Sequence, residues 1–404
     1  MYYHIVVTLL LLVFLTNLLL NLRFLRKPDP KRNVSQDPAP LISVLVPARN
    51  EAANIEECAN SLCAQDYPNF EILVLDDNST DDTGAIVQRI AARNQKVRLL
   101  RGVQLPPGWI GKPFACHQLA QEAKGEWLLF TDADTWHAPH ALRGALGHAL
   151  EHKLSLVSGW PHQRCTSIIQ HTVVPVFIFM ILSLFPLWLA RLQRQPSFGL
   201  TVGQFVFINA RDYWKIGGHE AVKARILEDM WLGFNAASNG LRQEALNLSN
   251  TVSTRMYQRA DQLWEGFTKW VYAIASMAPL GLAMVLVIAF CVFIAPAIWL
   301  IWQWTPIPSP VPWSVQIGVQ LVLIALMRAM VDWQFRSPLQ YLLTHPLGIG
   351  FMALSCLYAY VRHLTGAGVA WKGRVYEAEG EASATVEDEV GPTAEVGQRP
   401  RHVP

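Results

Sequence analysis

Long apolar stretches lie at both ends of the chain, and a region of mixed character lies between them. Residues 5–22 carry no charge and are long enough to span a bilayer, and no cleavage-site pattern of small residues follows them. We therefore expect residues 1–27 to form an N-terminal transmembrane anchor. No charged residue occurs between Lys269 and Arg328, so residues 271–361 are expected to hold further transmembrane helices.

The mixed region alternates short apolar runs with helical patterns. Four runs of strand length are expected to form strands: 42–46, 71–75, 97–100 and 127–130. Pro47 is expected to stop the first of them, and a later strand is expected at 205–208. Alternation at this spacing predicts an α/β fold, with a mostly parallel sheet covered by helices on both faces. Residues 41–270 would form this domain, after a polar, proline-rich linker at 28–40.

Two apolar segments are harder to place relative to a membrane. Residues 168–190 contain Pro175 and Pro186, so an interfacial or membrane-facing helix is favoured over a full span. Residues 271–304 are longer than one crossing needs, and they can hold two passes or a re-entrant turn. The number of C-terminal spans therefore stays open at three or four.

Basic residues predict the orientation of the chain. A basic cluster follows residue 22 and places the mixed region after it in the cytoplasm, which predicts a multi-pass protein of the inner membrane. Residues 362–404 begin with basic residues and are expected to be a cytoplasmic tail, acidic and disordered from about residue 377. Three C-terminal spans would leave this tail outside, in conflict with its basic start.

Composition excludes several other classes. The chain has 404 residues, of which 51% are hydrophobic and 16% charged, and this balance is apolar for a soluble protein. A formal net charge of +2 without a basic face gives no sign of a nucleic-acid partner. The six cysteines are scattered without a Cys-x-x-Cys pair, so neither a zinc site nor a disulfide framework is indicated.

Acidic residues follow the predicted strands. Asp132-Ala133-Asp134 comes directly after the run at 127–130, and Asp76-Asp77 comes after the run at 71–75. Ligands of such sheets bind beyond the carboxyl ends of the strands, so these acids can line one crevice. Two neighbouring carboxylates repel each other, but a divalent cation shared with a diphosphate stabilises them. Taken alone, Asp-x-Asp also fits a solvated acidic turn, which is the commoner case.

A set of motifs in a fixed order resembles family 2 glycosyltransferases, which have the GT-A fold. They are Pro47-Ala48-Arg49-Asn50-Glu51, Leu75 to Thr83, Gly108-Trp109-Ile110-Gly111-Lys112, Asp132-Ala133-Asp134, Gly217-Gly218-His219 and Glu228-Asp229. The resemblance covers about residues 41–270 and extends loosely to Trp371-Lys372-Gly373-Arg374. It is closest to membrane enzymes that glycosylate lipids, carotenoids or similar apolar acceptors.

The resemblance implies an inverting, metal-dependent transfer of one sugar from a nucleotide-sugar, a uridine-diphosphate hexose, to a lipophilic hydroxyl. Asp229 would be the general base with Glu228 beside it, and Asp134 with Asp132 would hold Mg²⁺ or Mn²⁺. The donor would be bound by residues from several motifs: Pro47, Ala48, Arg49, Glu51, Asp76, Asp77, Lys112, Asp132, Ala133 and Trp264. The partners would be this donor, a lipid-soluble acceptor and membrane lipids.

Several of these residues also have ordinary structural interpretations. Asp76 and Asp77 could cap a helix, although Asp81 and Asp82 lie nearer to one. Lys112 fits an exposed lysine about as well as a phosphate ligand, and Trp264 fits a core position. Glu228 and Asp229 suit the first turn of any helix, because the helix dipole favours acids there. His219 fits a packing role as well as an acceptor contact, and His137 fits a helix start better than a metal ligand.

One departure from the family pattern bears on the type of enzyme. Processive members carry Gln-x-x-Arg-Trp after the base, whereas here Ala260 and Leu263 precede Trp264 where Gln and Arg would stand. Arg255 or Arg259 could substitute as a diphosphate ligand. A processive polysaccharide synthase is therefore an alternative, but single transfer is favoured. A non-catalytic sugar-nucleotide-binding membrane protein or a transporter is a further alternative, which the acids disfavour.

Overall fold

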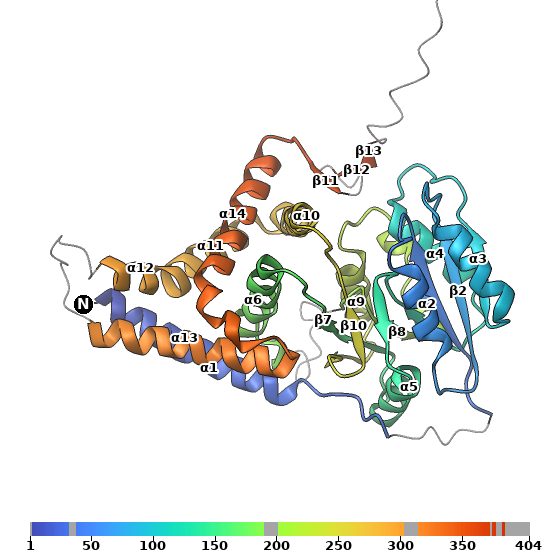
Figure 1. Cartoon of the computed structure of the whole chain (residues 1–404), viewed down its shortest axis with the longest axis horizontal. Coiled ribbons are helices and arrows are strands. Elements are labelled where there is room, and N and C mark those ends of the chain that lie inside the picture. Colours follow the sequence, from blue (N-terminus) through green and yellow to red (C-terminus); the bar gives the residue numbers. More distant parts are fainter. Residues whose placement is uncertain are drawn as a thin grey trace, which may run out of the picture.

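The structure is a computed structural model, and it describes residues 2–31, 38–189, 201–302, 314–371, 374–376 and 382–383. Most of the tail beyond residue 371, including the predicted disordered part, lies outside the described residues. Figure 1 shows an α/β domain, the catalytic domain expected from the sequence, at one end and a group of apolar helices at the other.

The catalytic domain is built on a seven-stranded sheet of order β3-β2-β1-β4-β8-β6-β9. Its strands are β1 (Ile42–Ala48), β2 (Phe70–Asp76), β3 (Val97–Arg101), β4 (Trp127–Phe130), β6 (Leu156–Trp160), β8 (Val206–Asn209) and β9 (Gln243–Asn247). The first four are parallel, and β8 pairs antiparallel with both β4 and β6. The prediction of a mostly parallel sheet is confirmed. A smaller sheet joins β5 (Thr135–His137), β10 (Val252–Thr254) and β7 (His162–Gln163).

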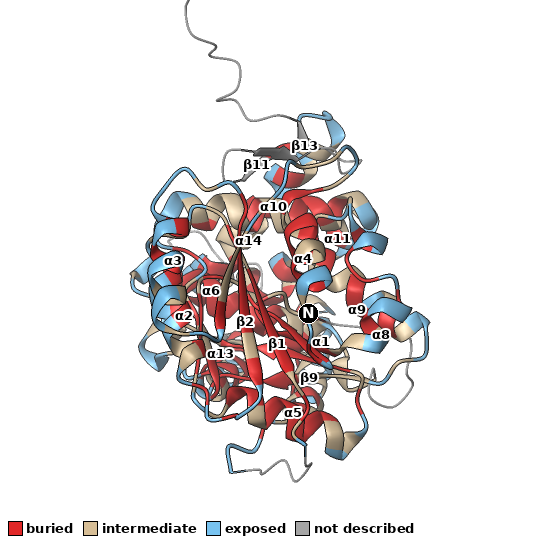
Figure 2. Cartoon of the chain, turned by 90° about the vertical axis from the view of Figure 1, so that its right-hand side faces the viewer, coloured by how far each residue is buried: buried red, intermediate tan, exposed pale blue. Residues whose placement is uncertain are grey.

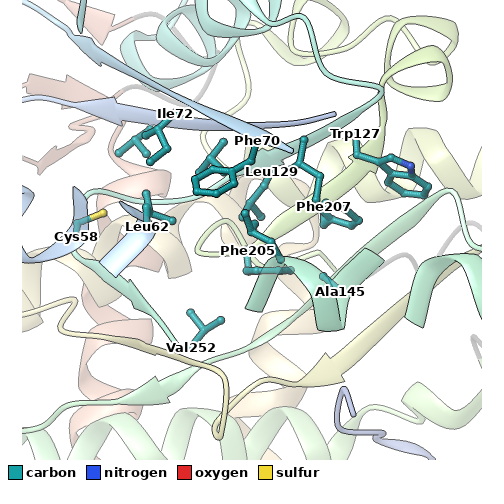
Figure 3. Packing of buried hydrophobic residues seen from close by; sticks show 14 of the residues in the cluster. Cys58, Leu62, Phe70, Ile72, Trp127, Leu129, Ala145, Phe205, Phe207 and Val252 are labelled. Atoms are coloured by element: carbon teal, nitrogen blue, oxygen red, sulfur yellow. The ribbon is translucent and has the colours of Figure 1, made fainter. Parts of the chain in front are cut away.

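Helices cover both faces of the large sheet, as predicted. The helices of one face are α2 (Ile55–Cys63), α3 (Thr83–Arg93) and α5 (Ala141–His152); those of the other are α4 (Gly111–Glu122), α8 (Ala210–Lys215) and α9 (Glu228–Ser238). The central strands are apolar on both sides, because each face is buried under a helix layer (Figure 2). Trp127 and Phe207 stack across neighbouring strands, with centroids 4.9 Å apart, in the core shown in Figure 3.

The prediction that Pro47 stops the first strand was wrong by two residues. β1 continues to Ala48, and Pro47 pairs in register with Leu75 of β2. The pairing of β1 with β4 ends earlier, at Leu45. Pro47 lacks a backbone N–H, but at its position β1 has no hydrogen bond to make to β4, so no hydrogen bond to that strand is lost. The strand therefore tolerates a proline and delivers residues 47–51 to the carboxyl edge of the sheet.

The helical part combines the N-terminal helix with helices from three later regions. They are α1 (Tyr2–Phe24), α6 (Ile168–Leu184), α10 (Ala260–Met277), α11 (Pro279–Ile288), η3 (Ala289–Ile294), α12 (Ala295–Trp302), α13 (Ser314–Phe335), η4 (Leu339–Thr344) and α14 (His345–Leu364). Three short strands follow within the described residues and form a small sheet: β11 (Val369–Trp371), β12 (Arg374–Tyr376) and β13 (Ala382–Ser383). Among the described residues, four stretches are long and apolar enough to cross a membrane: α1, Pro279–Trp302, α13 and Leu339–Leu364.

The described part of the apolar stretch, residues 271–302, holds one helix long enough to cross a membrane and not two. Its first part belongs to the amphipathic α10, which ends at Met277, and Pro279 then starts one continuous apolar helix that ends at Trp302. Pro296 lacks an N–H, and the π-helical segment η3 precedes it and absorbs the missing hydrogen bond. The sequence pattern could not locate this break, because both parts are apolar.

The predicted interfacial segment 168–190 contains α6, which is largely buried. Ser167 caps its start together with Gln170, and Pro175 lies inside the helix. Its side chains pack among α1, α13 and η3 in one apolar cluster. α6 therefore lies between the catalytic domain and the other apolar helices, and it forms a wall of the site described next.

Candidate active site

One cavity of about 380 Å³ joins the carboxyl edge of the sheet to α6 and α10. Residues from the ends of β1, β2 and β4 supply its polar side: Pro47, Ala48, Arg49, Glu51, Asp77, Asp132, Ala133 and Asp134. Apolar residues of the two helices supply the opposite side: Val174, Phe177, Ile178, Ile181, Phe267 and Trp270. Because parallel strands end at the same edge, acids from distant parts of the sequence meet in this cavity.

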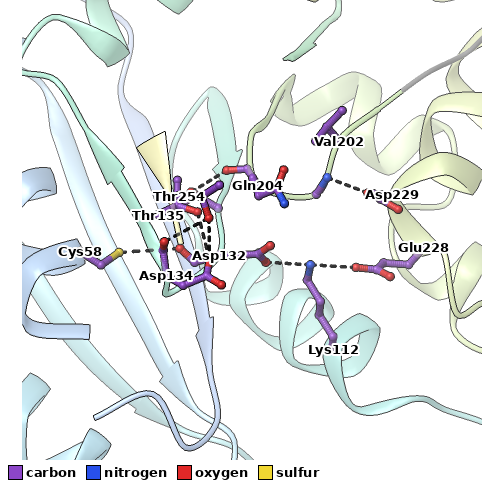
Figure 4. Close-up of polar contacts among 12 residues, drawn as sticks. Cys58, Lys112, Asp132, Asp134, Thr135, Val202, Gln204, Glu228, Asp229 and Thr254 are labelled. Atoms are coloured by element: carbon purple, nitrogen blue, oxygen red, sulfur yellow. Dashed lines mark hydrogen bonds and ion pairs between the residues drawn. The ribbon is translucent and has the colours of Figure 1, made fainter. Parts of the chain in front are cut away.

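Asp132 and Asp134 follow β4 and differ in how they are held. Asp134 Oδ1 accepts hydrogen bonds from the hydroxyls of Thr254, at 3.2 Å, and Thr135, at 3.3 Å. Asp132 Oδ1 lies 2.7 Å from Lys112 Nζ, as Figure 4 shows. The two carboxylates thus reach the cavity from a short turn whose backbone is fixed by the β5–β10 pairing.

Lys112 connects the acids of β4 with those of α9. Its ammonium lies 2.7 Å from Asp132 Oδ1 and 3.1 Å from Glu228 Oε1. Burial alone would lower the pKa of Lys112, but the surrounding carboxylates Asp132 and Glu228 raise it well above its usual value. The lysine is therefore a fixed positive charge inside the cavity, not an ordinary surface lysine.

Asp229 is held by backbone N–H groups at the start of α9. Its Oδ2 accepts a hydrogen bond from Gly203 N at 2.6 Å, and its Oδ1 accepts one from Met230 N at 2.8 Å. Burial and the neighbouring Glu228 raise the pKa of Asp229 to about 6, although Lys112 and the backbone donors oppose the increase. A carboxylate with this pKa is charged at neutral pH and can still accept a proton, as a general base requires.

Residues 43–201 match the family model described as glycosyl transferase family 2. Two curated relatives are both named 4,4'-diaponeurosporenoate glycosyltransferase. The one from Staphylococcus haemolyticus (strain JCSC1435) is 28% identical over 67% of this chain and 71% of its own length. The one from Staphylococcus aureus (strain MRSA252) is 28% identical over 56% of this chain and 60% of its own length.

Residues 43–201 therefore form a family 2 glycosyltransferase domain. One solved structure similar to the glycosyltransferase is a mannosyltransferase from Pyrobaculum calidifontis in complex with GDP-Man and Mn²⁺. It is 17% identical in sequence, with a TM-score of 0.49, and the match covers 88% of this chain and 99% of that one. Another is glucosyl-3-phosphoglycerate synthase from Mycobacterium tuberculosis in complex with Mn²⁺ and UDP-glucose, at 19% identity and a TM-score of 0.40 over 62% of this chain and 86% of that one.

Most of the residues predicted for donor and catalysis line the cavity of the glycosyltransferase. Those that do so are Pro47, Ala48, Arg49, Glu51, Asp77, Lys112, Asp132, Ala133, Asp134, Glu228 and Asp229. Asp76 and Trp264 are not among the lining residues. The carboxylate of Asp76 pairs with Arg101 and accepts a hydrogen bond from Ser79 N, and the Trp264 ring packs edge-on against Phe351 of α14.

The two histidines singled out from the sequence have packing roles. His219 is buried between Phe130 and Tyr213, and its Nδ1 lies 3.0 Å from the Tyr213 hydroxyl. His137 belongs to β5, whereas α5 begins four residues later at Ala141, so the prediction of a helix start was wrong. Burial lowers the pKa of both rings to about 3, which keeps them neutral.

Of the two arginines considered as diphosphate ligands, Arg255 lies nearer to the site. Its backbone N–H donates to the Asp134 carbonyl, and its side chain donates to Asn54 Oδ1 at 3.0 Å. Arg259 instead pairs with Asp261 at the exposed start of α10. The structure therefore favours Arg255 if either arginine contributes.

The donor set at Asp132 and Asp134 fits a hard divalent cation. Both residues offer carboxylate oxygens, which Mg²⁺ and Mn²⁺ prefer. The Lys112 ammonium between Asp132 and Glu228 shows that this group of acids already holds a positive charge. A second cluster, His148 with Glu151 and His152, also has metal-ligand spacing, but the Arg26 guanidinium lies 2.7 Å from His152 Nε2 and donates a hydrogen bond to the nitrogen that a metal would need.

Sequence reasoning missed the residues that position Asp229. Gly203 donates its N–H, and the Thr201 hydroxyl donates to the Asp229 carbonyl. A Cβ on residue 203 would lie 3.1 Å from both Asp229 Oδ2 and Lys112 Nζ, so an alanine there would displace the carboxylate or the ammonium by a few tenths of an ångström. A single glycine in the sequence does not indicate such a role. The contact forms only because the fold brings the residues before β8 next to the start of α9.

Proposed function

We propose that this glycosyltransferase moves a single sugar from a nucleotide-sugar to a lipophilic hydroxyl acceptor at the membrane surface, with inversion at the anomeric carbon. The observation that carries the proposal is the cavity itself, in which paired acids face an apolar wall from two helices. A charged donor and a water-insoluble acceptor need these two kinds of surface within one site.

The donor would bind along the carboxyl edge of the sheet. Residues 47–51 and Asp77 would contact the nucleoside, and Asp134 with Asp132 would hold Mg²⁺ or Mn²⁺ on the diphosphate. The metal would act as a Lewis acid that stabilises the negative charge of the leaving diphosphate. Lys112, whose ammonium already neutralises Asp132 and Glu228, would add a second positive charge on that side.

Asp229 would take the proton of the acceptor hydroxyl. As the acceptor oxygen bonds to the anomeric carbon, the bond from that carbon to the diphosphate breaks, and the hydroxyl proton moves to an Asp229 carboxylate oxygen. The backbone donors at Gly203 and Met230 fix the orientation of this carboxylate. Since the hydroxyl becomes acidic only as the bond forms, a base with a pKa of about 6 is sufficient.

The apolar wall would bind the acceptor. Phe177 of α6 contacts Phe267 and Trp270 of α10 edge-on, with centroids 5.6 and 4.6 Å apart. These rings face the acids across the cavity and offer an apolar surface for a hydrocarbon chain or ring system. The relatives named for a carotenoid acid support an acceptor of this general kind.

Single transfer is supported over a processive synthase. Trp264 packs against Phe351 and Tyr358 of α14 and not in the cavity, and Arg259 is exposed. Leu263 stands where the arginine of the processive motif would be and Trp264 does not line the cavity, so that motif is incomplete in the described site. The basic residues after α1 support a cytoplasmic catalytic domain at the inner membrane, and a uridine-diphosphate hexose is the proposed donor.

Mass spectrometry of lipid extracts tests this function. Cells producing the intact chain should contain a glycolipid that is absent from cells producing Asp229→Asn, and its mass would identify sugar and acceptor. Asp261→Asn is the matched control, because Asp261 is an exposed acid at the start of α10 that pairs with Arg259 outside the cavity. A glycolipid that persists in Asp229→Asn, or that never appears with the intact chain, would overturn the proposal.

A further inference from the structure

α14 has the length and composition of a transmembrane helix, but its position relative to the other apolar helices differs. α1 and α13 lie side by side, and the helix Pro279–Trp302 packs along them (Figure 1). α14 runs across the direction of α1 and α13 in Figure 1. Helices that cross a bilayer together usually lie within a few tens of degrees of one another.

The start of α14 is fixed on the side of the catalytic domain. α13 ends there, because His162 Nδ1 lies 3.0 Å from the Phe335 carbonyl and Asn247 donates to the Gln334 carbonyl. η4 follows at once, and Thr172 of α6 donates a hydrogen bond to the Thr344 hydroxyl at 3.1 Å. The chain therefore enters α14 beside the catalytic domain.

The end of α14 returns to the same side. Ser276, at the end of α10, lies 3.3 Å from His363 Nδ1. Cys356 and Ala359 of α14 pack in one cluster with Ile110, which belongs to the loop before α4 of the catalytic domain. α14 has 20 residues and is therefore about 30 Å long, which is the thickness of the apolar core of a bilayer. A helix that crosses the bilayer has its two ends on opposite sides, whereas both ends of α14 lie on the side of the catalytic domain.

One face of α14 is apolar and exposed. Its exposed residues recur at helical spacing: Leu347, Leu354, Leu357, Val361 and Leu364. The opposite face, with Gly348, Cys356 and Ala359, packs on α6 and α10. This is the pattern of a helix that lies in the plane of an interface with one side in lipid.

We propose that α14 lies flat on the bilayer surface that faces the catalytic domain, with its leucine stripe in the lipid. The chain then crosses the membrane three times, through α1, Pro279–Trp302 and α13. If the start of α1 lies outside the cell, three crossings place the C-terminal tail in the cytoplasm. Arg362 and the basic residues after it then lie on the same side as the catalytic domain. This removes the conflict between span number and tail charge that the sequence raised.

The arrangement also bears on the acceptor. α14 packs against α10, which with α6 forms the apolar wall of the cavity. A helix embedded at the interface would hold this wall level with the lipid surface, so an acceptor dissolved in the bilayer could reach it without entering water. The inference rests on the membrane association in the proposed function but not on the transfer reaction.

Labelling of single introduced cysteines tests the inference on the full chain in intact cells. Thr365→Cys reports the exposed end of α14, Glu56→Cys reports an exposed position on α2 of the catalytic domain, and Tyr2→Cys reports the start of α1. The unsubstituted chain gives the background from its six native cysteines. A membrane-impermeant maleimide is added before and after the cells are permeabilised.

We expect Thr365→Cys to behave like Glu56→Cys and to gain label only after permeabilisation, while Tyr2→Cys is labelled in intact cells. Labelling of Thr365→Cys together with Tyr2→Cys would show that α14 crosses the membrane and would overturn the inference. Because the comparison with Glu56→Cys needs no sugar transfer, the result is independent of whether the proposed function holds.

Discussion

The two sides of the cavity are held in place by different forces. On the sheet side, hydrogen bonds and ion pairs fix each acid, as with Gly203 N at 2.6 Å from Asp229 and Lys112 at 2.7 Å from Asp132. On the helix side, Phe177 and Trp270 are fixed only by apolar packing. Bond-making needs charges at defined positions, whereas binding a hydrocarbon needs only apolar area.

This difference predicts that substitutions on the two sides change different kinetic quantities. A change on the sheet side should reduce donor binding or the rate of the chemical step. A change on the helix side should raise the acceptor KM and leave donor binding intact.

Asp134→Asn should abolish metal-dependent donor binding and reduce transfer by about 10³-fold, because the metal loses a ligand and the diphosphate loses its charge stabilisation. Calorimetric titration of a nucleotide-sugar with and without Mn²⁺ measures the binding, and Asp261→Asn serves as the control. Metal-dependent binding of unchanged strength in Asp134→Asn would remove this residue from the metal site.

Gly203→Ala should reduce kcat by about 10- to 100-fold, because its Cβ would crowd both Asp229 Oδ2 and Lys112 Nζ and displace the base. Donor affinity should change much less. Gly240→Ala is a useful comparison for folding, since Gly240 lies after α9 with open space around it, although its φ of +71° adds backbone strain. A fully active Gly203→Ala would show that the position of Asp229 is not critical.

The rate should fall as the pH drops through about 6. The base must be deprotonated to accept a proton, and burial with Glu228 raises the pKa of Asp229 to about 6. At pH 5 about a tenth of the molecules would carry the charged carboxylate, so kcat should be about tenfold below its plateau at pH 7 to 8. A profile that stays flat down to pH 5 would contradict the assignment of Asp229.

Phe177→Ser should raise the acceptor KM by about 5- to 20-fold and leave the donor Kd unchanged, because the wall loses an aromatic ring. Phe290→Ala is the matched control, since Phe290 is half exposed on η3 and does not line the cavity. An equal loss of donor and acceptor binding in Phe177→Ser would show that the two sides of the cavity are not separable.

The sheet side could be predicted from sequence, since each acid directly follows a local apolar run or opens a local helix. The helix side could not, because its residues gather through contacts between α6 and α10, about ninety residues apart. The same limit explains why two of the predicted donor-binding residues do not line the cavity. Asp76 meets Arg101 of β3, and Trp264 meets Phe351 of α14, and neither neighbour can be read from the local pattern.

The central claim is that Asp229 deprotonates the acceptor in a site that binds the donor independently. The most direct test measures single-turnover transfer and donor binding on the same preparation of Asp229→Asn. We predict that transfer falls by about 10²- to 10⁴-fold while the donor Kd stays within about twofold of the intact enzyme. Transfer at the intact rate, or a loss of donor binding as large as the loss of transfer, would contradict the claim.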